Sequence, residues 1–177
     1  MGLLVPAIVM AALGAVLVLH LVEHRRRPDD THALQLAAEL GTGSPVYLAE
    51  HGWCISLDTR TSIQVHEYNV IVRRTLVAPG RCTILSAPLQ GRSQEDYLGG
   101  QMLVPGPSGW MVGGNLREVR EWERQIPLSL PARMEALGVR AIVVEEVAAW
   151  ASCGLSAGAS QVRATKGLLA LLDRKLS

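Results

Sequence analysis

The first apolar segment of the chain is also its longest. The residues from Leu3 to Val22 carry no charge, and His20 is the one strongly polar side chain among them. A helix of about 20 residues rises about 30 Å, which matches the hydrocarbon thickness of a bilayer. A polar stretch begins at Glu23. This pattern predicts a transmembrane helix that anchors one soluble domain.

The basic residues around this segment set the expected orientation. Arg25, Arg26 and Arg27 follow the apolar run, whereas no basic residue precedes it. A cleavable signal peptide, the alternative, would have basic residues in front and a small-residue cleavage site behind. Arginines beside a membrane helix remain on the cytoplasmic side. We therefore expect the N-terminus outside, an anchor with its basic flank over residues 1–27 and a cytoplasmic domain over residues 28–177.

Small residues repeat along one side of the expected membrane helix. Ala7, Ala11 and Ala15 are four positions apart, and Gly14 lies beside them. Small side chains at this spacing let a second helix approach closely within a bilayer. The alternative is chance, because alanine is common in membrane helices. Besides the lipid bilayer, we expect the helix to contact an integral membrane protein partner or a second copy of the chain.

Beyond the anchor, the first half of the chain alternates apolar and polar residues. Around Ile63 and Val65, and again around Val70 and Val72, polar residues separate apolar ones, as in half-buried strands. A short helix near residues 30–40 precedes the strands and ends at Gly41. Strands are expected over residues 46–50, 53–57, 62–76 (one long strand or two short ones), 81–86, 102–104 and 110–112.

The second half of the chain combines helices with a buried strand. Helices are expected over residues 116–126, 131–138, 147–152 and from 160, where Ser160 is the expected cap, to near the C-terminus. The run from Val139 to Val144 is apolar and β-branched, as in a strand buried on both faces. A β-rich half followed by helix–strand–helix predicts an α+β or α/β domain with a mixed β-sheet and flanking helices.

Composition indicates a source and a compartment. Lysine occurs only at Lys166 and Lys175, and phenylalanine is absent, which indicates a GC-rich bacterial genome. The three cysteines, an odd number at wide spacing, favour a reducing compartment. The net charge of +1 gives no general argument for a nucleic-acid partner. We therefore expect a protein of the bacterial inner membrane that binds no nucleic acid.

Nucleotide-binding motifs do not occur in the sequence. Neither G-x-x-x-x-G-K-[ST] nor G-x-G-x-x-G is present. The loop from Gly154 to Ser160 precedes the last expected helix, and backbone amides there could hold a small anion. Its glycine spacing does not match a phosphate-binding loop, so a flexible loop is the simpler interpretation. A small-anion sensor remains an alternative function.

Histidine and cysteine residues offer two further candidate sites. His51 and Cys54 are close in sequence, and His66 and Cys82 on later strands could complete a zinc site. Structural zinc usually draws on two close pairs, and here there is one. Cys54 and His66 could also act as a nucleophile and its base, but no third group orients them. We therefore expect no catalytic, cofactor-binding or metal residues, with a membrane-tethered hydrolase as the alternative.

The order of elements resembles the membrane-anchored, nuclease-related domains of the restriction-endonuclease-like class. The shared order is a membrane helix, three arginines, a short helix, strand hairpins and a helix–strand–helix end. The resemblance implies a metal-binding acidic residue on one core strand and E-x-K on the next. Glu67 lies on the strand expected over residues 62–76, but the strand over residues 81–86 supplies neither Glu nor Lys. The resemblance thus implies a scaffold without nuclease activity.

The anchor, the small-residue helix side and the lack of catalytic motifs favour a non-catalytic role. We expect a membrane-anchored accessory or interaction subunit of a larger bacterial membrane assembly, such as an energy-transducing complex. The alternatives are a membrane-tethered enzyme of hydrolase or nuclease-like type and a small-anion sensor.

Overall fold

Four helices and nine strands make up the part of the chain that the computed structural model describes, which is residues 14, 30–48, 52–66, 69–86, 103–105, 111–113 and 116–177. The helices are α2 (Asp30–Leu40), α4 (Leu116–Gln125), α5 (Leu130–Ala136) and α6 (Ala159–Leu176). The strands are β1 (Val46–Leu48), β2 (Gly52–Asp58), β3 (Thr61–Val65), β4 (Asn69–Thr75), β5 (Cys82–Leu85), β6 (Leu103–Pro105), β7 (Met111–Gly113), β8 (Val139–Glu145) and β9 (Ala148–Gly154).

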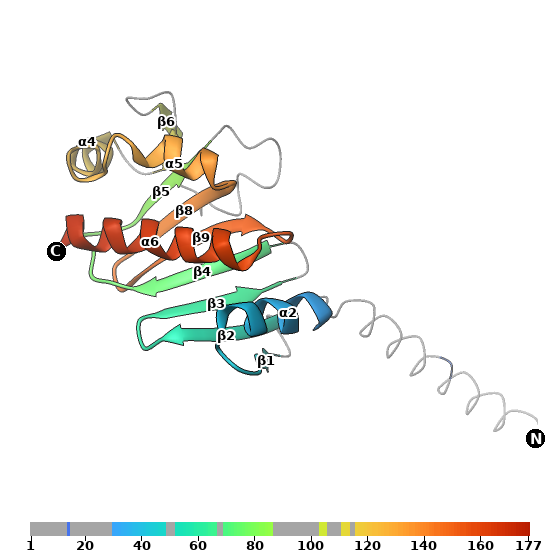
Figure 1. The fold of residues 1–177 in the computed structure, drawn as a ribbon. Helices are drawn as coiled ribbons and strands as arrows, with labels where there is room; N and C mark the ends of the chain where they lie inside the picture. The colour runs from blue at the N-terminus through green and yellow to red at the C-terminus, as the bar shows by residue number, and fades with distance from the viewer. Residues whose placement is uncertain are drawn as a thin grey trace, which may run out of the picture.

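The strands form a single sheet in the order β1-β2-β3-β4-β9-β8-β5-β7-β6 (Figure 1). Each pair of neighbours is antiparallel. The C-terminal hairpin of β8 and β9 lies in the middle of the sheet, between β4 and β5. The centre of the sheet is therefore built from segments that are far apart in the sequence.

This antiparallel sheet corrects the predicted mixed sheet. The prediction placed a helix over residues 147–152, and a helix between two strands is the usual connection of a parallel pair. Instead, Glu146 and Val147 form a tight turn, and β9 runs back along β8. The alanines of β9 favour a helix by propensity, but pairing with β4 on one side and β8 on the other overrides it. The nuclease-like order of elements loses its helix–strand–helix end for the same reason.

The predicted transmembrane helix is also corrected. Its residues, Leu3 to Val22, lie outside the described ranges except for Gly14. Across those ranges, no helix is both long enough and apolar enough to cross a bilayer. Helix α6 has 18 residues, but it carries charged side chains from Arg163 to Lys175. The described domain is thus an antiparallel sheet with helices, and the spanning helix of the predicted fold class is not part of it.

Most of the shorter predicted elements are confirmed. Helix α2 ends as expected at Gly41, whose φ of +70° suits glycine. Residues 62–76 contain two strands, β3 and β4, which pair with each other. The expected cap of the last helix is wrong, because α6 is capped by Gly158 rather than Ser160.

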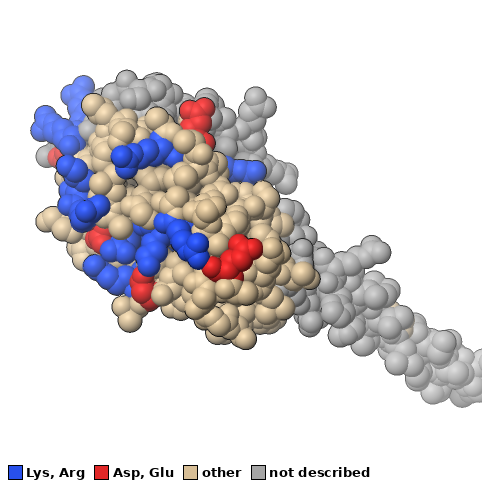
Figure 2. Space-filling model, in the orientation of Figure 1, with Lys and Arg blue, Asp and Glu red and all other residues tan. Residues whose placement is uncertain are grey.

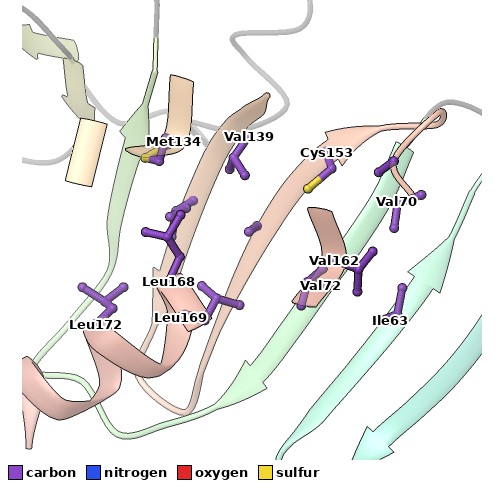
Figure 3. Packing of buried hydrophobic residues seen from close by; sticks show 14 of the residues in the cluster. Ile63, Val70, Val72, Met134, Val139, Cys153, Val162, Leu168, Leu169 and Leu172 are labelled. Atoms are coloured by element: carbon purple, nitrogen blue, oxygen red, sulfur yellow. The ribbon is translucent and has the colours of Figure 1, made fainter. Parts of the chain in front are cut away.

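One face of the sheet carries the hydrophobic core. Helices α2, α5 and α6 lie on this face, in front of the sheet in Figure 1. Val162, Leu169 and Leu172 of α6 recur at helical spacing, and each is 0% exposed. They belong to one cluster with buried residues from the strands and from α5, including Ile63, Val70, Val72, Met134, Val139 and Cys153 (Figure 3). These three helices do not lie on the opposite face of the sheet.

Candidate functional site

The residues predicted to pack and orient a membrane helix are described only at Gly14. Gly14 is helical and exposed, and no heavy atom lies within 4 Å of the position that a Cβ would take. The other positions, which lie outside the described ranges, are Ala7, Ala11, Ala15, Arg25, Arg26 and Arg27. Their roles in assembly and topology stay predictions.

The candidate metal ligands do not come together. His51 and Glu67 lie outside the described ranges. Cys54 is on β2 and Cys82 on β5, five strand spacings apart in the sheet, which is roughly 24 Å. Among the described residues, no three side chains of His, Cys, Asp or Glu are grouped so that they could hold a metal ion. Cys82 therefore cannot complete a site with Cys54.

The described thiols Cys54 and Cys153 have different surroundings. Cys54 lies opposite Gln64 of β3, so His66 is its diagonal neighbour, at a typical spacing of about 7–8 Å. Cys153 is buried on β9, with its Sγ 3.7 Å from Oγ1 of Thr165. Burial raises the pKa of the Cys153 thiol, which therefore stays protonated and acts as a packing residue.

The loop between β9 and α6, predicted as an alternative anion site, has no basic lining. The N–H of Ala157 donates to the carbonyl of Gly154 at 3.0 Å, which closes the loop on itself. The adjoining hollow, of about 480 Å³, is lined by Ala136, Leu137, Gly138, Ser160 and Gln161. The side-chain amide of Gln161 donates to the carbonyl of Leu137. Among the described residues that line this hollow none is basic, so an anion there would meet only neutral donors such as the Ser160 hydroxyl and backbone amides.

A different group of residues lies together on the helix-free side of β2, β3, β4 and β9. The strand register places Arg73 of β4 directly between Ser62 of β3 and Trp150 of β9. On the same strands, Ile71 lies opposite Gln64. All of these side chains are at least partly exposed. We call this surface the open face, and it consists of Ser56, Ser62, Gln64, Ile71, Arg73 and Trp150.

The same side of β5 and β8 is closed. Thr83 and Leu85 of β5, and Ala141 and Val143 of β8, are each 0% exposed, although none belongs to the helix-side core cluster. Val143 is the direct partner of Trp150. On this side of the sheet, the boundary between the closed part and the open part therefore lies between β8 and β9.

Two hollows mark the open face, and Arg73 lines both. The first, which we call the corner hollow, has a volume of about 300 Å³ and is lined by Ser56, Asp58, Thr59, Arg60, Thr61, Ser62, Arg73 and Thr75. The second, the tryptophan hollow, has about 240 Å³ and is lined by Gln64, Ile71, Arg73, Glu145 and Trp150. The two hollows are therefore neighbours on one surface.

Ion pairs occupy the carboxylates near the corner hollow. Asp58 lies 2.6 Å from Nζ of Lys166 and accepts the backbone N–H of Arg60 at 2.8 Å. The hydrogen bond from Lys166 is the main reason why the pKa of Asp58 is lowered to about 2. Asp173 of α6 accepts Nη2 of Arg74 at 2.8 Å and Nε at 2.9 Å, and it lies 3.6 Å from Nη1 of Arg60. Both carboxylates are therefore already matched by cations.

Arg73 and Trp150 were not identified from the sequence, although the sequence contains a signal for Arg73. Arg73 and Arg74 are adjacent in a strand whose alternate residues Val70 and Val72 are apolar. Because side chains alternate between faces, Arg74 lies on the core side with the valines and Arg73 on the other side. Arg74 finds Asp173 on the core side, whereas Arg73 forms no ion pair with another described residue.

The helix-bearing side of the domain is also basic. Figure 2 shows Lys and Arg side chains gathered over α6 and toward its C-terminal end. Arg163, Arg174 and Lys175 of α6 are exposed there, and Arg163 donates to the backbone carbonyl of Glu39 at 2.5 Å. These side chains line none of the hollows described above. The open face is therefore the surface that combines exposed cationic, aromatic and apolar groups with a concave shape.

Comparison with known proteins gives a likeness in fold. No protein-family model matches the chain. No curated protein matches it either. Among solved structures, the fold is similar to the crystal structure of the mycobacterial trehalose monomycolate transport factor A, with a TM-score of 0.51 and 11% sequence identity over 77% of this chain and 81% of that chain.

Proposed function

We propose that this chain is a non-catalytic accessory module of a larger bacterial membrane assembly, and that an integral membrane protein partner docks on the open face. The observation that carries this proposal is the juxtaposition of Ile71, Arg73 and Trp150 on an exposed sheet surface. Tryptophan and arginine are the side chains most enriched at the centres of protein interfaces.

Two further observations support an accessory role. Within the part of the chain that the structure describes, no three side chains of His, Cys, Asp or Glu are grouped so that they could hold a metal ion. The similar structure carries the name of a transport factor, and its name gives that protein a part in the transport of trehalose monomycolate. By analogy with that similar fold, we propose that this chain also acts as a factor in a larger process.

A cytoplasmic location at the bacterial inner membrane is part of the proposal. Cys54, Cys82 and Cys153 are all free thiols, as expected in a compartment where thiols are kept reduced. Cys54 is partly exposed on β2 and would be open to oxidation elsewhere.

The test is recovery of the partner with the full chain from its native host in mild detergent. We expect one integral membrane protein in a fixed ratio to the wild-type chain. Ile71→Ser should lower its recovery about fivefold to tenfold, because an apolar anchor at the centre of an interface contributes about 1–2 kcal/mol. Leu34→Ser is the matched control, since Leu34 is 50% exposed on α2, on the other side of the sheet.

Three results would refute the proposal. The first is a wild-type chain that carries no partner in fixed ratio. The second is equal recovery with Ile71→Ser and wild type, provided that circular dichroism shows both to be folded. The third is recovery of a soluble protein as the partner. That result would be compatible with docking on the open face, but it would refute membership of a membrane assembly.

A further inference from the structure

The corner hollow is lined by hydroxyl and guanidinium groups. Hydroxyl side chains come from Ser56 and Thr59 on the β2–β3 hairpin, from Ser62 on β3 and from Thr75 on β4, and the cations are Arg60 and Arg73. Its volume of about 300 Å³ is at the lower end of the range for small-molecule sites. Each hydroxyl can donate one hydrogen bond and each guanidinium several. The hollow is thus rich in donors.

The charge around this hollow is positive. Among the described residues that line it, Asp58 is the one that is acidic, and Nζ of Lys166 lies 2.6 Å from its carboxylate. Asp173, behind the hairpin, is shared by Arg74 and Arg60. Together with Arg73, these groups comprise four cations and two carboxylates, and Glu145 of the neighbouring tryptophan hollow lowers the surplus from two positive charges to one. Within the described lining of the corner hollow, the carboxylate of Asp58 has a cation beside it.

Arg73 is the residue best placed to bind an anion in this hollow. It is exposed on β4, its strand neighbour across β3 is the hydroxyl residue Ser62, and within the described chain it forms no ion pair. A guanidinium presents a planar fork of donors that fits two oxygens of a phosphate at once. A tetrahedral phosphoryl group has a further oxygen for the hydroxyls, whereas a planar carboxylate would use the fork alone.

We propose that the corner hollow binds a phosphoryl group, carried by free phosphate or by the headgroup of an anionic lipid, with Arg73 as its principal ligand. The proposal shares Arg73 with the proposed docking surface, but it rests on the donors that line the corner hollow, so phosphate binding and partner recovery test the two proposals separately. It also moves the predicted anion-binding role from the loop over residues 154–160 to the opposite side of the sheet.

Glu145 provides an internal check on this site. It lines the tryptophan hollow beside Arg73, and in the described structure it forms no ion pair. Its negative charge lowers the attraction for an anion held by Arg73. Neutralising Glu145 should therefore strengthen binding, which is the opposite of what neutralising Arg73 should do.

The experiment is calorimetric titration of the purified full chain with inorganic phosphate at constant ionic strength, beside sedimentation with phosphatidylglycerol and phosphatidylcholine vesicles. Arg73→Gln should weaken phosphate binding at least about tenfold, because it removes a charge-assisted bidentate contact. Arg133→Gln, which removes an exposed arginine from α5, should change it less than about twofold, because exposed charges more than a Debye length away are screened. Glu145→Gln should strengthen it about twofold.

The outcomes separate the sources of the phosphoryl group. Phosphate binding that depends on Arg73, without a preference for phosphatidylglycerol, supports a free ion. A preference for phosphatidylglycerol vesicles that Arg73→Gln abolishes supports a lipid headgroup. The proposal is overturned if wild type binds neither probe, or if Arg73→Gln and Arg133→Gln weaken binding equally. Loss of phosphate binding with an intact membrane partner would leave the accessory function standing.

Discussion

Strands β3 and β8 belong to one sheet but differ in how they are buried. In β3, Ile63 and Val65 are 0% exposed, whereas Ser62 and Gln64, which alternate with them, are partly exposed. In β8, every residue from Ala141 to Val144 is 0% exposed. One half of the sheet is therefore core on both sides, and the other half has one side partly exposed. Both hollows with Arg73 lie on that second half.

Helix α6 is attached to the two halves by different forces. Ion pairs connect Asp173 and Lys166 of α6 to Arg74 and Asp58 on the β2–β4 side. Toward β8, the helix instead contributes buried leucines such as Leu169 to the apolar cluster (Figure 3). The stability of the open half should therefore respond to charge and pH, and that of the closed half to apolar volume.

The largest effect should come from truncating an aliphatic side chain of the closed half. Leu85→Ala should lower the free energy of unfolding by about 2–5 kcal/mol, because Leu85 is fully buried and its loss leaves a cavity. Ile71→Ala removes a similar side chain from the open face and should cost less than about 1 kcal/mol. Urea denaturation of both variants measures the difference. Equal losses would contradict the distinction between the two halves.

A smaller loss is expected from the ion pair that attaches α6 to the open half. Asp173→Asn should lower the free energy of unfolding by about 2 kcal/mol, because it leaves the largely buried Arg74 without a carboxylate partner. The loss should be smaller than for a fully buried ion pair, because solvent reaches part of the Arg74 side chain. Arg60→Gln should cost less than about 1 kcal/mol, because the Arg60 side chain is 58% exposed. A larger loss with Arg60→Gln than with Asp173→Asn would reverse our assignment of the dominant pair.

The smallest effect concerns pH. The pKa of Asp58 falls from 3.8 to about 2 on folding, so its contribution is complete above about pH 4 and disappears as the pH falls toward 2. Because Asp58 and Lys166 are both more than a third exposed, screening limits this contribution to about 0.2–1 kcal/mol. In Asp58→Asn, the loss of unfolding free energy between about pH 4 and pH 2 should be smaller than in wild type by that amount. An unchanged acid slope in low salt would show that the pair contributes nothing.

The sequence was informative wherever a local pattern decided the structure. Alternation at Val70 and Val72, and the apolar run at Val139 to Val144, predicted β4 and β8 correctly. Strand β9 was missed because its alanines favour a helix, and only pairing with its two neighbours makes it a strand. The site was missed for a similar reason. Arg73 and Arg74 differ in role because Asp173 lies 99 positions after Arg74, and no local pattern reveals that partner.

The central position of the β8–β9 hairpin has a consequence for synthesis of the chain. Strands β4 and β5 can pair early with β3 and β7, but each lacks its second neighbour until residues 139–154 have left the ribosome. Until then, each of them presents an unpaired edge, the kind of edge that recruits other chains. Closing the sheet also needs contacts across long stretches of sequence, which slows folding. A nascent chain that stops before β8 is therefore two separate sheet fragments, and the last quarter of the polypeptide is what unites them.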